Sequence, residues 1–137
     1  MDYLIDPSLK YYMNKDILES PKKRILVVDD SPVIRSLLNR KLTKQGFTVI
    51  QACTGDEVVE LINDMDNLEL PQAAIVDREM PGITSGMQCA FQLKQRGVDT
   101  VAYTAGATPN TIETYQRQGI PVFDKLEMNK VVRRMSY

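Results

Sequence analysis

From residue 24 onward, short runs of apolar and β-branched residues alternate with segments whose apolar residues recur at helical spacing. The short runs lack internal alternation of apolar and polar residues, which indicates strands buried on both faces of a parallel sheet. Right-handed crossovers then place helices on both faces. The sequence therefore predicts an α/β fold with a doubly wound, five-stranded parallel sheet. The predicted strands are 24–29, 47–51, 71–77, 98–104 and 120–124, and the predicted helices are 31–46, 54–65, 85–96, 108–118 and 127–135.

Local chemistry marks where several of these helices begin and end. Ser31 can cap a helix that has a proline at its first position, where proline is tolerated. Gly46 is typical of the residue that follows a helix, and Thr54 and Glu57 have the spacing of a capping box. The apolar residues predicted to face the core are Ile34, Leu37, Leu38 and Leu42, then Val58, Leu61, Ile62 and Met65, then Met87, Ala90 and Phe91, and finally Met128, Val131, Val132 and Met135.

Length and charge exclude several classes of protein. A chain of 137 residues corresponds to one domain. With 17 basic and 18 acidic residues, it has no basic excess that would indicate direct binding to nucleic acid or to an anionic membrane. Its apolar runs are too short to span a bilayer, and its N-terminus lacks the pattern of a signal peptide. We therefore expect a cytoplasmic protein.

The chain contains no histidine, which excludes Ser-His and Cys-His dyads, histidine-ligated metals and a phosphohistidine of its own. Its two cysteines, Cys53 and Cys89, form no CxxC motif, so neither a disulfide framework nor a zinc site is indicated. We expect both thiols to be reduced and packed as small apolar groups.

Residues 1–22 lie outside the alternating pattern and form a predicted N-terminal extension, while residues 23–137 form the predicted domain. The extension holds three of the six tyrosines and several aliphatic residues. It either folds onto the domain, which we favour, or docks on a partner.

Polar side chains end four of the predicted strands. Asp29 and Asp30 follow the first strand, Asp77 ends the third, Thr104 ends the fourth and Lys125 follows the fifth. In an open parallel sheet the carboxyl ends of the strands form the ligand-binding crevice, so we expect these groups to converge. Taken singly, each could be a cap, a loop residue or a solvated charge. The joint pattern favours a site.

Three carboxylates in one crevice repel each other unless a cation compensates them. Oxygen ligands without histidine or cysteine favour Mg²⁺, which binds few carboxylates and leaves room for a phosphoryl group. Lys125 would supply a second positive charge, and the Thr104 hydroxyl could donate a hydrogen bond to a phosphoryl oxygen. Asp77 is the natural nucleophile, because carboxylates form aspartyl phosphates.

Four short motifs resemble the receiver domain of two-component response regulators. They are Val27-Val28-Asp29-Asp30-Ser31, Asp77-Arg78-Glu79-Met80-Pro81-Gly82, Tyr103-Thr104-Ala105 and Asp124-Lys125. The resemblance extends from Lys23 to about Met135 and implies a flavodoxin-like (βα)₅ fold with strand order 2-1-3-4-5.

The resemblance also implies roles for individual residues. Asp77 would be the phosphoacceptor, and Asp29, Asp30, Asp77 and the backbone carbonyl of Glu79 would hold Mg²⁺. Thr104 and Lys125 would bind the phosphoryl oxygens. Phosphorylation would then draw Thr104 inward and repack the fourth helix and fifth strand.

Four departures from the family pattern bear on output. Val122 stands where the family usually has an aromatic switch residue, with Phe123 predicted on the opposite face and Tyr103 as a candidate substitute. Leu126 replaces the usual cis proline, so we expect a trans peptide. The loop 81–86 is one residue longer than usual, and the last helix is short.

The resulting hypothesis is a receiver that takes up and hydrolyses its own aspartyl phosphate and signals to a downstream protein, rather than an enzyme acting on other substrates. A sensor histidine kinase or a phosphotransfer protein would supply the phosphoryl group. The receiver would be a monomer or a weak dimer, without a membrane or nucleic-acid partner. Alternatives are a receiver excised from a hybrid histidine kinase or multidomain regulator, a small Mg²⁺-dependent phosphatase or phosphotransferase, and an unphosphorylated scaffold.

Overall fold

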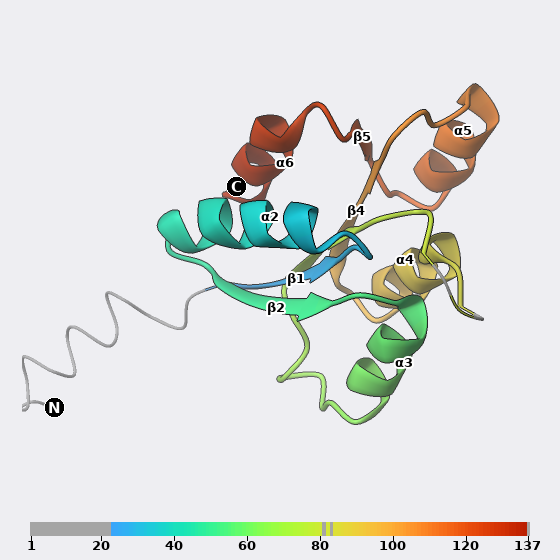
Figure 1. The fold of residues 1–137 in the computed structure, drawn as a ribbon. Helices are drawn as coiled ribbons and strands as arrows, with labels where there is room; N and C mark the ends of the chain where they lie inside the picture. Colours follow the sequence, from blue (N-terminus) through green and yellow to red (C-terminus); the bar gives the residue numbers. More distant parts are fainter. Residues whose placement is uncertain (1–22, 81, 83, 137) are drawn as a thin grey trace, which may run out of the picture.

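The computed structural model describes residues 23–80, 82 and 84–136. Within these described residues, five strands and five helices alternate (Figure 1). The strands are β1 (Arg24–Val28), β2 (Thr48–Ala52), β3 (Ala73–Val76), β4 (Asp99–Thr104) and β5 (Val122–Asp124). The helices are α2 (Pro32–Lys44), α3 (Gly55–Asn63), α4 (Gly86–Gln95), α5 (Pro109–Arg117) and α6 (Met128–Met135). All ten predicted elements are therefore present, and the ends of most differ from the prediction by a few residues.

The strands form one parallel sheet in the order β2-β1-β3-β4-β5, which confirms the predicted topology. β1 lies at the centre of the order reversal, with β2 on one side and β3 on the other. The register pairs Val28 with Val76, the last residues of β1 and β3. Whatever follows these two strands must therefore lie side by side at the carboxyl edge of the sheet.

Helices cover both faces of the sheet (Figure 1). Successive strand residues point to opposite faces, so each strand contributes to both layers of the core. In β1, Leu26 and Val28 pack in the cluster under α3, α4 and α5, whereas Ile25 and Val27 pack under α2 and α6. All four are almost completely buried, as expected for strands that read as continuous apolar runs.

The predicted helix starts are confirmed at the atomic level. The hydroxyl of Ser31 accepts from the backbone N–H of Ile34, and the hydroxyl of Thr108 accepts from that of Thr111. Ser85 forms a capping box with Gln88, which the sequence analysis had not singled out. Thr54 accepts from the N–H of Glu57, but the Glu57 carboxylate bonds the Cys53 thiol instead of completing a box.

Two packing predictions were wrong. Leu37, predicted to face the core, is 37% exposed. Successive residues of a helix point in different directions around its axis, so when Leu38 and Leu42 face the core, Leu37 lies at the edge of the buried face. Cys53 is only partly buried, and its thiol hydrogen-bonds the Glu57 carboxylate at 3.2 Å. Cys89 is buried, and both thiols are free, as predicted. Across the described part of the chain, none of the helices has the length and apolar character that crossing a bilayer requires.

Candidate functional site

The carboxyl edge of β1 and β3 carries two buried aspartates. Asp29 follows β1 and donates its N–H to the carbonyl of Ala52 on β2 at 3.1 Å. Asp77 follows β3 and donates its N–H to the carbonyl of Val28 on β1 at 2.8 Å. Backbone pairing across three strands thus fixes both residues, and their exposed fractions are 1% and 4%.

Asp30 completes an acidic cluster with these two residues. One carboxylate oxygen from each of Asp29, Asp30 and Asp77 lies within 4.8 Å of the other two. Asp30 is exposed, so the cluster opens to solvent on one side. Three hard oxygen donors at this spacing, without nitrogen or sulfur ligands, fit an Mg²⁺-like ion.

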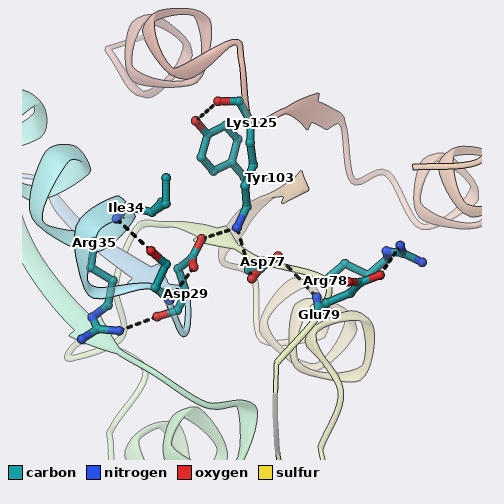
Figure 2. Close-up of polar contacts among 9 residues, drawn as sticks. Asp29, Ile34, Arg35, Asp77, Arg78, Glu79, Tyr103 and Lys125 are labelled. Carbon is teal, nitrogen blue, oxygen red and sulfur yellow. Dashed lines mark hydrogen bonds and ion pairs between the residues drawn. The ribbon is translucent and has the colours of Figure 1, made fainter. Parts of the chain in front are cut away.

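Lys125 bridges the two buried aspartates. Its Nζ lies 2.9 Å from Oδ2 of Asp29 and 3.3 Å from Oδ2 of Asp77 (Figure 2). Burial alone would lower the pKa of Lys125, but the hydrogen bond and the negative charge of Asp29, joined by those of Asp77, raise it instead. The ammonium group is therefore held charged, and it compensates part of the acidic cluster.

Asp77 remains incompletely compensated. Burial, followed by the charge of Asp29, raises its pKa from 3.8 to about 6, although Lys125 and the N–H of Glu79 act in the opposite direction. A carboxylate with a raised pKa beside other acidic groups is characteristic of functional sites. Further positive charge at this point would favour its ionised, nucleophilic form.

Neighbouring groups orient Asp29. Its Oδ1 accepts from the backbone N–H of Ser31 at 2.9 Å, and its backbone carbonyl accepts from Nη1 of Arg35 at 2.7 Å (Figure 2). The sequence analysis missed Arg35. Its place in the first turn of α2, the helix that follows the acidic pair, is the signal that could have revealed it.

The two other predicted residues lie beside the cluster. Thr104 ends β4, the strand next to β3, and is 1% exposed. The N–H of Glu79 donates to Oδ1 of Asp77 at 3.3 Å, which keeps the Glu79 backbone next to the phosphoacceptor candidate. The Glu79 side chain pairs with Arg78 at 2.6 Å, away from the cluster (Figure 2).

The structure describes the residues around Lys125 that depart from the family pattern. Val122 packs in the cluster under α3, α4 and α5, and Phe123 packs in the one under α2 and α6, as the period of two predicts. Tyr103 is fully buried, and its hydroxyl donates to the backbone carbonyl of Lys125 at 2.8 Å (Figure 2). The Lys125–Leu126 peptide is trans, as expected.

The last helix is short, as predicted, with the eight residues of α6. The prediction that the loop 81–86 is one residue longer than usual concerns positions 81 and 83, which lie outside the described residues. The extension 1–22 also lies outside them.

The chain matches a family of known proteins. Residues 25–125 match the family described as "Response regulator receiver domain". The chain is 29% identical over 120 residues to the CAI-1 autoinducer sensor kinase/phosphatase CqsS of Vibrio cholerae, covering 81% of this chain and 17% of that protein. It is 38% identical over 82 residues to the uncharacterized transcriptional regulatory protein YrkP of Bacillus subtilis, covering 60% of this chain and 33% of that protein.

Solved structures support the same fold. A CheY-like response regulator receiver domain protein from Methanospirillum hungatei superposes with a TM-score of 0.73 at 23% identity, covering 84% of this chain and 91% of that chain. A receiver domain from the Francisella response regulator 1452 gives a TM-score of 0.72 at 18% identity, covering 84% and 94%. The chain thus spans nearly all of these isolated domains, but only 17% and 33% of the two longer relatives.

Proposed function

Because the chain belongs to the family of response regulator receiver domains, we propose that it accepts a phosphoryl group on Asp77 and passes the signal to a protein partner. The observation that carries the proposal is the meeting of Asp29, Asp30 and Asp77 within 4.8 Å, with Lys125 between the two buried members. No single segment of the chain supplies this arrangement, because its groups come from β1, β3 and β5.

Asp29, Asp30, Asp77 and the backbone carbonyl of Glu79 are the groups that would hold Mg²⁺. When bound, the ion supplies positive charge for both the acidic cluster and the oxygens of the transferring phosphoryl group. The donor set fits this role, since all its members are oxygens and one side of the cluster faces solvent through Asp30.

The protein's own residues would carry the transfer. A carboxylate oxygen of Asp77 attacks phosphorus, an O–P bond forms, and the bond from phosphorus to the donor group breaks. Lys125 exchanges its contact with Asp77 for one with a phosphoryl oxygen, and the Thr104 hydroxyl donates to another. Attack by water on the phosphorus later returns Asp77 to a carboxylate, so the phosphoryl state is transient.

The donor histidine must lie outside this sequence, which contains none. A sensor histidine kinase or a phosphotransfer protein would supply it, and a downstream protein would read the phosphorylated state. We place this exchange in the cytoplasm between protein surfaces, with the receiver a monomer or weak dimer and without direct binding to nucleic acid.

A second arrangement is a receiver that forms one unit of a hybrid kinase or multidomain regulator. The observation that favours it is the match of this chain to 17% of a sensor kinase/phosphatase. A hybrid kinase would place the donor histidine in the same polypeptide, upstream of the receiver. To separate the two arrangements, the isolated chain is incubated with a purified histidine kinase that has no receiver of its own. Efficient phosphorylation favours a receiver used alone, and poor phosphorylation favours a receiver that takes its phosphoryl group from a histidine in the same polypeptide.

Labelling of Asp77 tests the proposal. Incubation with Mg²⁺ and acetyl phosphate should add one phosphoryl group per chain by intact mass, and Asp77→Asn should abolish the adduct. Asp64→Asn, which alters an exposed aspartate at the end of α3, is the matched control and should label normally. Equal labelling of Asp77→Asn would refute the assignment, and sustained turnover of free phosphoesters would favour the phosphatase alternative.

A further inference from the structure

The loop between β3 and α4 is anchored at its base beside Asp77. The N–H of Gly86 donates to the carbonyl of Arg78 at 3.2 Å. A Cβ at Gly86 would lie 1.9 Å from the carbonyl oxygen of Asp77, so only glycine permits this approach of α4 to the loop. Met80, further along, packs against the apolar cluster under α3, α4 and α5.

The tip of the same loop is held by a side chain from a different element. The N–H of Thr84 donates to Oδ1 of Asp56 at 2.8 Å. Gly82, with φ of +112°, lies so close that a Cβ there would be 2.5 Å from Oδ2 of the same carboxylate. Both oxygens of Asp56 therefore face the backbone of the loop tip.

Asp56 is well placed to hold this position. It lies in the first turn of α3, where the exposed N–H groups of the helix stabilise a negative charge. The helix start is itself fixed, because Thr54 caps it through the N–H of Glu57 at 3.1 Å. A Cβ at Gly55 would lie 2.5 Å from the carbonyl oxygen of Thr84, so the backbone at the start of α3 lies against the backbone of Thr84.

We infer that Asp56 is a positioning residue for the metal and phosphoryl site, acting through the backbone N–H of Thr84 on the loop that carries Glu79. This inference rests on the proposed function, because the Glu79 carbonyl matters only if it is a ligand. Because Thr84 and Gly86 are both held by hydrogen bonds, the described residues of the loop have less conformational freedom to lose when the ion binds. Without the hydrogen bond from Thr84 to Asp56, the loop must be ordered when Mg²⁺ binds, and this entropic cost lowers the affinity for Mg²⁺.

Three variants isolate the contact. Asp56→Ala removes the acceptor, Asp56→Asn keeps an oxygen for the Thr84 N–H while removing the charge, and Glu60→Ala removes an exposed charge from the same helix. Calorimetric titration of the metal-free proteins gives the Mg²⁺ affinity, and acetyl phosphate labelling at increasing Mg²⁺ gives the rate.

We expect Asp56→Ala to bind Mg²⁺ severalfold more weakly, because the loop end at Thr84 must then be ordered as the ion binds. Its labelling rate should fall at limiting Mg²⁺ and recover at saturating Mg²⁺. Asp56→Asn should bind nearly as tightly as the parent, and Glu60→Ala should match the parent. A purely structural role would lower the midpoint of thermal unfolding without this dependence on Mg²⁺.

Gly82→Ala tests the contact from the loop side. Its methyl group would collide with the Asp56 carboxylate, so it should weaken Mg²⁺ binding more in the parent than in the Asp56→Ala background. Parent-like affinity of Asp56→Ala, or equal loss in Asp56→Asn and Asp56→Ala, would overturn the inference while leaving the proposed function intact. A parent that neither binds Mg²⁺ nor takes up label would refute both.

Discussion

Replacing Asp77 by asparagine removes a buried charge while keeping the shape of the side chain, so we expect the metal-free protein to become more stable. Burial and the charge of Asp29 raise the pKa of Asp77 from 3.8 to about 6. That gap, at about 1.36 kcal/mol for each unit of pKa, corresponds to a destabilisation of about 3 kcal/mol when Asp77 is ionised in the folded protein. The carboxamide oxygen can still accept from the N–H of Glu79, and Lys125 keeps its contact with Asp29.

The sign of this effect depends on pH. In the unfolded chain Asp77 ionises above pH 3.8, whereas in the folded protein it keeps its proton up to about pH 6. Folding therefore takes up a proton in this window, and the stability of the parent falls as the pH rises through it. The asparagine variant lacks this loss. Its advantage should be near zero below the window and reach its full size above it.

Urea unfolding followed by far-UV circular dichroism, in the presence of EDTA, measures the difference at about pH 4 and about pH 7.5. Adding Mg²⁺ at the higher pH should narrow the gap, because the parent gains more binding energy than the variant. Asp64→Asn is the control for removing an exposed carboxylate. If Asp77→Asn were no more stable than the parent at the higher pH, or if the difference did not change with pH, the electrostatic account of the site would be wrong.

Three further outcomes follow from individual contacts. Lys125→Ala should lower the free energy of unfolding of the metal-free protein by about 2 kcal/mol, which is less than for a fully buried pair because Lys125 is 22% exposed. The variant should still bind Mg²⁺, but its conformational response to beryllofluoride should be impaired. A response like that of the parent, measured by amide hydrogen exchange, would contradict the role assigned to Lys125. Gly86→Ala should destabilise by about 2 kcal/mol in urea unfolding, because the methyl group meets the Asp77 carbonyl, although alanine is the better helix former; a stabilised variant would show that the loop moves freely. Two tyrosine substitutions should change the stability in opposite directions. Tyr103→Phe removes the hydrogen bond to the Lys125 carbonyl and should lower the free energy of unfolding by about 1 kcal/mol, whereas Tyr115→Phe removes a buried hydroxyl that has no partner among the described residues and should raise it by about 1 kcal/mol. Equal effects of the two substitutions would contradict this difference in hydrogen bonding.

Local features of the sequence predicted the sequence of elements and most of their contacts. Ser31 is recognisable as a cap because a cap depends on the few residues that follow it. The opposite faces of Val122 and Phe123 followed from the period of two of a strand. Exposure was harder to predict, as Leu37 shows, because helical spacing defines a stripe but not its width against a particular neighbour.

The candidate site shows the same division. Its aspartates were visible in the sequence because each follows an apolar run, and an open parallel sheet gathers the ends of its strands at one edge. Only the tertiary structure places β1 next to β3 and brings Lys125, 96 residues along the chain from Asp29, to within 2.9 Å of it. The contact between Asp56 and Thr84, 28 residues apart, was likewise invisible. Chemistry that depends on neighbours along the chain can be read from the order of residues, whereas compensation of charge and anchoring of loops depend on which distant segments the folded sheet makes adjacent.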